Sequence, residues 1–265
     1  MAADLAAGLI PLVGLTVATW WILALSATYL FRAIALYLVA SALILLRIPP
    51  DAGGPGMGWA NRVTLARTTL VLPVAGLVVH PGAIGPLGYW WALGVAGIAM
   101  VLDGVDGRVA RRTATVSDFG GRFDMELDAF LLLALSILVW QSGQVGPWVI
   151  LIGALRYLFV GAGWFRPALR NELPPSRRRQ TICVVQGLAL LVCLAPAVPS
   201  TWASLVAAVA LGLLVCSFAV DVWWLRRRSS VQSTIPVSAG RHRRGPGEDQ
   251  AGPPRPERSG FPRRE

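Results

Sequence analysis

Long runs without a charged side chain are the feature of this sequence that most limits its possible folds. Residues 86–102 contain no charge, and residues 5–46 form one apolar run that is interrupted only by Arg32 and by a Ser-Ala-Thr patch at 26–28. Because about 20 apolar residues span a bilayer as a helix, the longer run predicts two helices with a tight turn near residues 26–32. The sequence therefore predicts an all-α integral membrane protein.

Composition supports the same fold class. Hydrophobic residues make up 55% of the 265 residues and charged residues only 14%, with a mean hydropathy of +0.59. A soluble domain would carry about one quarter charged residues, so a soluble globular protein is excluded. The net charge of +10 comes from arginines beside the apolar runs or in the C-terminal tail. This placement favours contact with anionic membrane lipid and predicts no nucleic-acid partner.

Six further apolar segments follow a Pro/Gly-rich linker at residues 47–60. They are expected at residues 61–79, 86–103, 124–140, 148–165, 181–194 and 203–225. The predicted architecture is a six-helix transmembrane core plus an N-terminal pair of transmembrane helices. The expected segments are the N-terminal helix pair at 1–50, the core at 58–228, and a disordered basic tail at 229–265.

Arginine is distributed unevenly between the loops on the two sides of the predicted bundle. The loops on the side of residues 103–128 contain fifteen arginines, whereas the opposite loops, HPGAIGP, QSGQVGP and LAPAVPSTW, contain none. The positive-inside rule then places the 103–128 segment and both termini in the cytoplasm. We expect a multi-pass protein of the cell (plasma) membrane.

The charged segment at 103–128, DGVDGRVARRTATVSDFGGRFDMELD, lies between two apolar runs. Asp103 and Asp106 are three residues apart, and Asp124 and Asp128 are four apart, so each pair lies on one helix face. Four carboxylates that converge at a membrane edge need compensating positive charge. Hard divalent cations prefer oxygen ligands, so the pattern predicts a site for two Mg²⁺ or Mn²⁺ ions. The alternative is a solvated loop whose carboxylates share no ligand.

Small and basic residues within the same segment suit a phosphate-containing ligand. Gly107 and Gly120 leave room for a close approach to the backbone, and Arg111 supplies a guanidinium fork that fits phosphate oxygens. Together with bound metal, these residues indicate metal-assisted phosphoryl chemistry.

The segment resembles the CDP-alcohol phosphotransferase (CDP-alcohol phosphatidyltransferase) family, whose pattern is D-x2-D-G-x2-A-R-x8-G-x3-D-x3-D. All eight specified positions match, namely Asp103, Asp106, Gly107, Ala110, Arg111, Gly120, Asp124 and Asp128. The resemblance covers residues 58–228 and implies transfer of a phosphoalcohol, most simply phosphatidyl, from a CDP-alcohol such as CDP-diacylglycerol to an acceptor hydroxyl. Release of CMP, a role in phospholipid biosynthesis and a homodimer are also implied. Glu126 stands where many members carry a small or apolar residue, and no function is predicted for it.

The resemblance also assigns roles to individual residues. Asp103, Asp106 and Asp124 would hold the metal ions, while Asp128 would contribute to the metal site and act as the catalytic general base. The CDP-alcohol would be bound by Gly107, Ala110, Arg111, Ser117 and Gly120, and by a cluster on the first core helix, Asn61, Thr64 and Arg67. For this last cluster the alternative is snorkelling of polar side chains to the membrane interface.

Arginines elsewhere are candidates for binding the acceptor. Arg156 lies within the apolar segment 148–165, where a charge is costly unless it faces a polar cavity or snorkels to the headgroups. The loop at 166–181 adds further arginines, including Arg177, Arg178 and Arg179. Such a cluster fits either a phosphorylated polyol acceptor or anionic lipid.

A non-enzymatic transporter that uses the carboxylates as a divalent-cation site is the rival interpretation. Transport favours polar residues at several depths of the membrane. In the predicted core spans Arg156 is the main residue of this kind, so the enzyme is the favoured reading.

Overall fold

The computed structural model describes residues 2–47, 59–80, 84–113, 118–165 and 176–232. These residues form helices and no strands, which confirms the all-α prediction. The helices are α1 (Ala2–Ile22), α2 (Ala27–Arg47), α3 (Trp59–Val78), α4 (Pro86–Thr113), α5 (Asp118–Gln141), the 3₁₀ turn η1 (Pro147–Val149), α6 (Ile150–Phe165), α7 (Arg177–Leu194) and α8 (Ser200–Gln232).

Two stretches of the described chain are long and apolar enough to cross a membrane. They are Pro86–Gly104 in α4 and Ser200–Trp224 in α8. Shorter apolar stretches occur in α1, α2, α3 and across η1 and α6. The structure is therefore compatible with a helical membrane protein, and the division into six core spans and an N-terminal pair stays a prediction.

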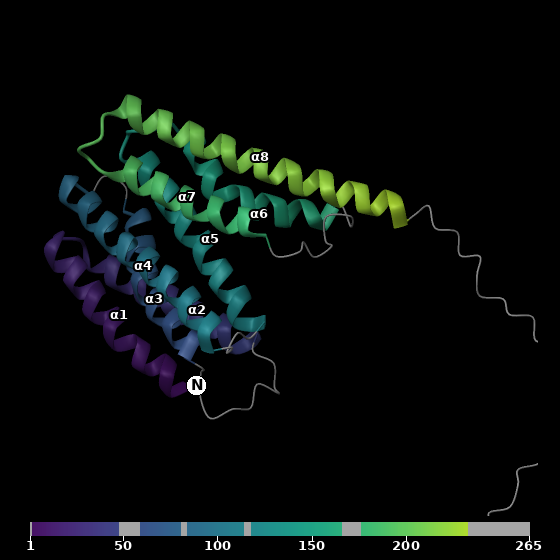
Figure 1. Cartoon of the computed structure of the whole chain (residues 1–265). Coiled ribbons are helices and arrows are strands. Elements are labelled where there is room, and N and C mark those ends of the chain that lie inside the picture. Colours follow the sequence, from purple (N-terminus) through teal and green to yellow (C-terminus); the bar gives the residue numbers. More distant parts are fainter. Residues whose placement is uncertain (1, 48–58, 81–83, 114–117, 166–175, 233–265) are drawn as a thin grey trace, which may run out of the picture.

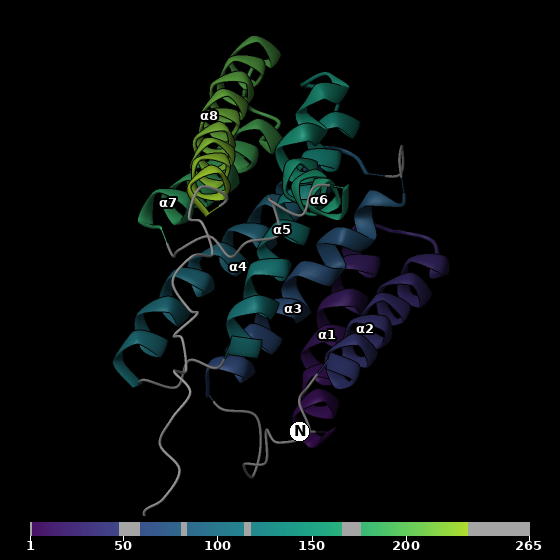
Figure 2. The same cartoon turned by 90° about the vertical axis from the view of Figure 1, so that its right-hand side faces the viewer.

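Helix α3 packs against four other helices, α1, α2, α4 and α5. Figures 1 and 2 show α1 and α2 on one side of the bundle and α8 on the other. Helix α5 contacts α3, α6 and α7 and so links the two sides. Its side chains Leu131, Leu135 and Leu138 are buried in the shared apolar core. The site elements α3, α4 and α5 are thus fixed by packing on several faces.

The connection between α1 and α2 lies earlier in the chain than the sequence predicts. Helix α1 ends at Ile22 and α2 begins at Ala27, whereas we expected a turn near residues 26–32. The reversal takes place at Ala24, whose φ of 48° is in the left-handed region. Arg32 does not interrupt α2, because its Nη1 donates a 2.9 Å hydrogen bond to the carbonyl of Val79 just beyond α3.

Polar contacts fasten the N-terminal helices to α3 and α4. The Tyr29 hydroxyl donates to the Pro73 carbonyl in α3 at 2.9 Å, and the Trp91 indole of α4 donates to the Thr19 hydroxyl of α1 at 3.0 Å. A buried hydrogen bond of this kind adds about 1 kcal/mol. The first two helices therefore brace α3 on the side that faces away from α5 to α8.

Candidate active site

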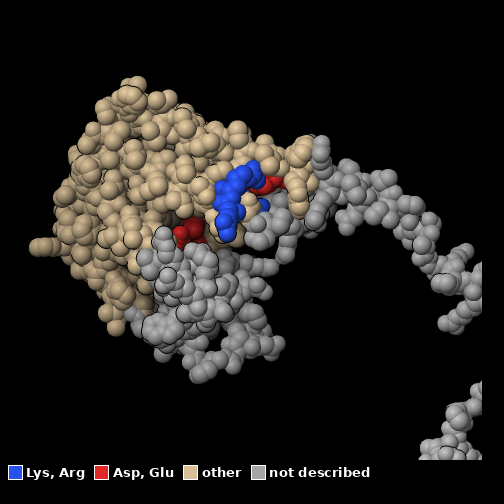
Figure 3. Space-filling model, in the orientation of Figure 1, with Lys and Arg blue, Asp and Glu red and all other residues tan. Residues whose placement is uncertain are grey.

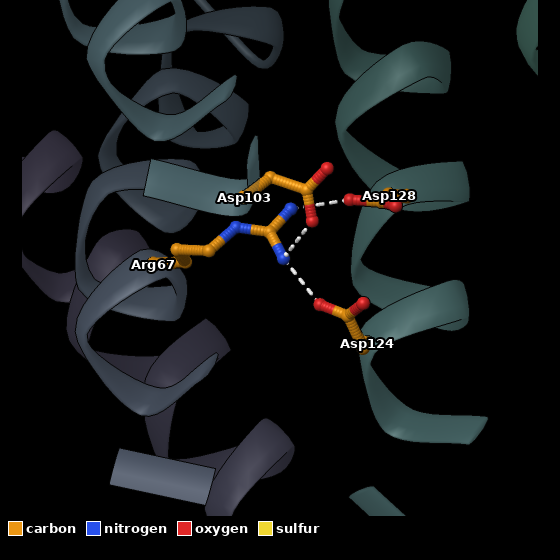
Figure 4. A network of polar contacts seen from close by, with 4 residues as sticks. All are labelled: Arg67, Asp103, Asp124 and Asp128. Atoms are coloured by element: carbon orange, nitrogen blue, oxygen red, sulfur yellow. Dashed lines mark hydrogen bonds and ion pairs between the residues drawn. The ribbon is translucent and has the colours of Figure 1, made fainter. Parts of the chain in front are cut away.

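Three of the four predicted metal-ligating aspartates converge in the structure. Asp103 comes from α4, and Asp124 and Asp128 come from adjacent turns of α5. One carboxylate oxygen from each lies within 4.8 Å of the others. Figure 4 shows the three side chains pointing toward a common centre. The side chain of Asp106, the fourth predicted ligand, lies outside the described residues.

Arg67 of α3 occupies the space between these carboxylates (Figure 4). Its Nη1 lies 2.8 Å from Oδ1 of Asp103 and also binds Asp124, while Nη2 binds Asp128. The Arg67 side chain is only 1% exposed, but the three carboxylates are 26–39% exposed. The cluster thus has a closed side formed by Arg67 and an open side formed by carboxylates.

Charge balance shows what else the cluster can bind. A guanidinium removed from water needs carboxylate partners to repay its desolvation, and Arg67 has three. The three carboxylates still exceed the one guanidinium by two negative charges. An accessible, oxygen-rich site with this excess fits a hard divalent cation such as Mg²⁺ or Mn²⁺. Asp103, Asp124 and Asp128 are the described residues able to hold it.

The position of Arg67 also bears on the snorkelling alternative. A snorkelling arginine extends toward the headgroup region and water. Arg67 is instead buried and points from α3 toward α4 and α5. The sequence predicted its involvement in the site but not its carboxylate partners.

Most of the predicted nucleotide contacts lie where the backbone alone is described. All of these residues lie in helices except Ser117, which lies outside the described residues. Their side chains are likewise outside the described set: Asn61 and Thr64 on α3, Gly107, Ala110 and Arg111 on α4, and Gly120 on α5. Their roles in CDP-alcohol binding stay predictions.

Three of the four arginines predicted to bind the acceptor have carboxylate partners, whereas the fourth, Arg177, is exposed at the start of α7. Arg156 on α6 binds Glu126 on α5, with Nη2 to Oε1 at 2.5 Å. On α7, Arg178 binds Asp221 of α8, and Arg179 Nη1 lies 3.9 Å from the same carboxylate. Figure 3 shows charged side chains of described residues gathered in one part of this face, beside a broad area of described residues without charge.

Two carboxylates in these pairs were not predicted as site residues. Glu126 was noticed as an oddity of the motif without an assigned partner. Asp221 was not singled out, although it is the one charged residue in the apolar segment 203–225. That isolated charge was the available signal, because a buried acid in an apolar helix calls for a cationic partner.

Comparison with known families gives one match. The model of the CDP-alcohol phosphatidyltransferase family matches residues 57–216, which is more than half of the chain. The chain belongs to this family. The match includes the aspartate cluster, Arg67 and Arg156, but not helices α1 and α2 or Asp221. No curated protein and no solved structure gives a significant match.

Membership establishes the reaction class at a coarse level. Enzymes of this family are phosphotransferases that move a phosphoalcohol from a CDP-alcohol donor to a hydroxyl acceptor, typically with a divalent metal. The convergence of Asp103, Asp124 and Asp128 supplies a group of carboxylates suited to such an ion.

Proposed function

We propose that this chain is a membrane-embedded, metal-dependent CDP-alcohol phosphatidyltransferase. It transfers a phosphatidyl group from CDP-diacylglycerol or a related CDP-alcohol to an acceptor hydroxyl and releases CMP. The observation that carries the proposal is the meeting of motif carboxylates from α4 and α5 around one buried arginine. A solvated loop would not bring these groups within 4.8 Å of one another.

The motif residues divide the work of donor binding. Asp103, Asp106, Asp124 and Asp128 hold two divalent ions, Mg²⁺ or Mn²⁺. Bound metal supplies neutralisation of the donor diphosphate and stabilisation of the departing CMP. The nucleotide and headgroup are held by Asn61, Thr64, Gly107, Ala110, Arg111, Ser117 and Gly120. Arg67, which we also expected to contact the CDP-alcohol, positions the three carboxylates that it binds.

Asp128 is the proposed general base. An acceptor hydroxyl is a weak nucleophile, so a carboxylate within hydrogen-bond reach must accept its proton as it attacks phosphorus. Asp128 lies one turn beyond Asp124 on α5, and its Oδ1 accepts a hydrogen bond from Arg67. This bond fixes the carboxylate and leaves Oδ2 for the acceptor proton.

The proposed setting is the cytoplasmic edge of the cell membrane. Large apolar side chains on the outside of the bundle support lipid contact, for example Ile10, Trp21 and Phe31, which are all more than 70% exposed. A site at this edge lets a lipid donor stay in the bilayer while CMP leaves into water. The same proposal includes a homodimer and contact of the arginines with anionic lipid. It also divides the chain into an N-terminal helix pair at 1–50, a core at 58–228 and a tail at 229–265.

The test is CMP release by the purified full chain. The protein is supplied with CDP-diacylglycerol, Mg²⁺ or Mn²⁺, and a panel of glycerol phosphate, inositol phosphate, serine and neutral polyols. We expect acceptor-dependent CMP release that disappears in Asp124→Asn protein of equal purity and melting temperature. If no acceptor supports release, but vesicles containing the protein take up divalent cations, the transporter interpretation replaces the enzyme.

A further inference from the structure

The N-terminal helices α1 and α2 lie outside the residues that match the family, which begin at residue 57. Both helices nevertheless pack on α3, the helix that carries Arg67. Figure 2 shows α1 and α2 together beside α3. The family chemistry gives this pair no task, and its contacts with α3 indicate one.

Helix α3 has a local weak point close to Arg67. Pro73 lies inside the helix and has no N–H to bind the carbonyl of Thr69, one turn earlier. Arg67 precedes Pro73 by six residues, which is about 9 Å along a helix axis. A helix bends most readily where its hydrogen-bond ladder is interrupted. The part of α3 that carries Arg67 can therefore shift against the part beyond Pro73 unless neighbouring helices hold both parts.

Tyr29 of α2 holds α3 at Pro73 and beyond it. The Tyr29 side chain is fully buried, and its hydroxyl donates a 2.9 Å hydrogen bond to the Pro73 carbonyl. Its ring lies against Gly76 of α3, where an added Cβ would lie 3.0 Å from the Tyr29 Cε2. The absence of a side chain at Gly76 thus lets α2 approach α3 closely on this side of the weak point.

The N-terminal pair also holds α3 on the other side of the weak point. Leu65 is only 5% exposed and lies two residues before Arg67. A Cβ added to Gly8 of α1 would lie 3.2 Å from the Leu65 Cδ2 and 2.6 Å from the Tyr37 hydroxyl of α2. Helices α1, α2 and α3 therefore meet closely here. Arg67 lies between this contact and the one at Pro73.

The position of Arg67 matters because one guanidinium serves three carboxylates. Arg67 reaches across to Asp103 of α4 and to Asp124 and Asp128 of α5. Charge-assisted hydrogen bonds of this kind are short and depend steeply on distance and angle. A small shift of α3 would therefore separate Arg67 from some of its partners. The carboxylates would then lose the arrangement that gathers them within 4.8 Å of one another.

We propose that the N-terminal helix pair is a positioning element for the aspartate cluster and that Tyr29 is the positioning residue through which it acts. Because the pair fixes α3 on both sides of its weak point, Arg67 stays where it arranges the carboxylates for a divalent cation. The effect of Tyr29 on turnover rests on the proposed function. Its effect on metal affinity does not.

The first experiment measures manganese affinity of the purified full chain by electron paramagnetic resonance. Tyr29→Phe keeps the ring against Gly76 and removes only the hydroxyl, so affinity should fall about threefold, less than the full net contribution of a buried hydrogen bond allows. Gly76→Ala is the second variant, because its Cβ must push the Tyr29 ring away by a few tenths of an ångström. It should weaken manganese binding in the same direction. Unchanged affinity in both variants would overturn the proposal.

A double-mutant cycle with Arg67 separates positioning from a general loss of stability. If Tyr29 acts through Arg67, Tyr29→Phe should not weaken manganese binding further in the Arg67→Gln background. A full loss in that background would overturn the proposal. Gln186→Leu is the matched control, because the amide of Gln186 donates a buried 2.9 Å bond from α7 to the Ala210 carbonyl of α8. This variant should bind manganese like the wild type, and a loss equal to that of Tyr29→Phe would also overturn the proposal.

Turnover provides the last readout. At the manganese concentration that half-saturates the wild type, CMP release by Tyr29→Phe should fall about twofold, as mass action requires for a threefold weaker site, and saturating manganese should restore it. A loss that saturating manganese does not relieve would contradict action through the cluster. If the wild type releases no CMP with any acceptor, the proposed function fails, but manganese affinity still decides the role of Tyr29.

Discussion

Arg67 and Arg156 both bind carboxylates of α5 from a neighbouring helix, but their surroundings differ. Arg67 is 1% exposed and binds three aspartates, whereas Arg156 is 31% exposed and binds one glutamate. A buried guanidinium cannot lose its partners without a large desolvation cost. A partly exposed pair can open, because water replaces each partner at little cost. Burial thus separates a fixed structural cluster from a pair that can open to solvent.

The largest expected effect is on the fixed cluster. Asp103→Asn, Asp106→Asn and Asp124→Asn each remove the charge of a metal ligand. Replacing a residue that only supports a ligand lowers activity by up to about 100-fold, so loss of a ligand itself should lower turnover by more than about 100-fold. CMP release at saturating CDP-alcohol, measured over a range of Mg²⁺ and Mn²⁺ concentrations, is the assay. Full turnover of Asp124→Asn protein at the wild-type metal concentration would contradict a shared metal site.

Asp128 tests the division of labour inside the cluster. Asp128→Asn should lower kcat by about 100-fold, the usual loss for a general base, while affinity for the CDP-alcohol falls less. Turnover and nucleotide affinity are measured on the same preparation. A near-wild-type kcat would remove Asp128 from the role of base and leave it as a ligand only.

Replacing Arg67 and Arg156 in turn compares the buried cluster with the partly exposed pair directly. Arg67→Gln leaves three carboxylates without their buried cation and should destabilise the chelated protein by about 3 kcal/mol. Arg156→Gln should cost about 0.5 kcal/mol, as expected for a partly exposed pair. Melting temperatures in detergent with chelator give both values. Addition of Mg²⁺ should restore part of the loss in Arg67→Gln, and equal losses in the two variants would erase the distinction between the regions.

The pair of Arg178 and Asp221 is expected to be intermediate. Asp221 is 8% exposed, but its partner Arg178 is about one third exposed and can turn to water. Asp221→Asn should therefore cost about 1 kcal/mol. A melting-temperature loss as large as that of Arg67→Gln would show that the contact of α7 with α8 depends on this pair as strongly as the site depends on Arg67.

Local spacing predicted the parts of the site that lie within one helix. Asp124 and Asp128 share a face because they are four residues apart, and the long uncharged runs predicted helices. The partners of Arg67 and Arg156 lie on other helices, and nothing in the spacing of residues that are 30 or more positions apart encodes their contact. The α1–α2 turn was misplaced because Arg32 looked like an interruption, whereas its side chain reaches the carbonyl of Val79 and α2 continues.

Direct metal binding tests the central claim most sharply. Manganese binding to the purified chain is followed by electron paramagnetic resonance in the wild type, in Asp124→Asn and in the Glu126→Gln control, with CMP release measured on the same samples. Saturable binding that parallels turnover, a large loss of both in Asp124→Asn and unchanged metal affinity in Glu126→Gln is the predicted result. CMP release that persists in excess chelator, or manganese affinity that is the same in Asp124→Asn as in the wild type, would contradict it.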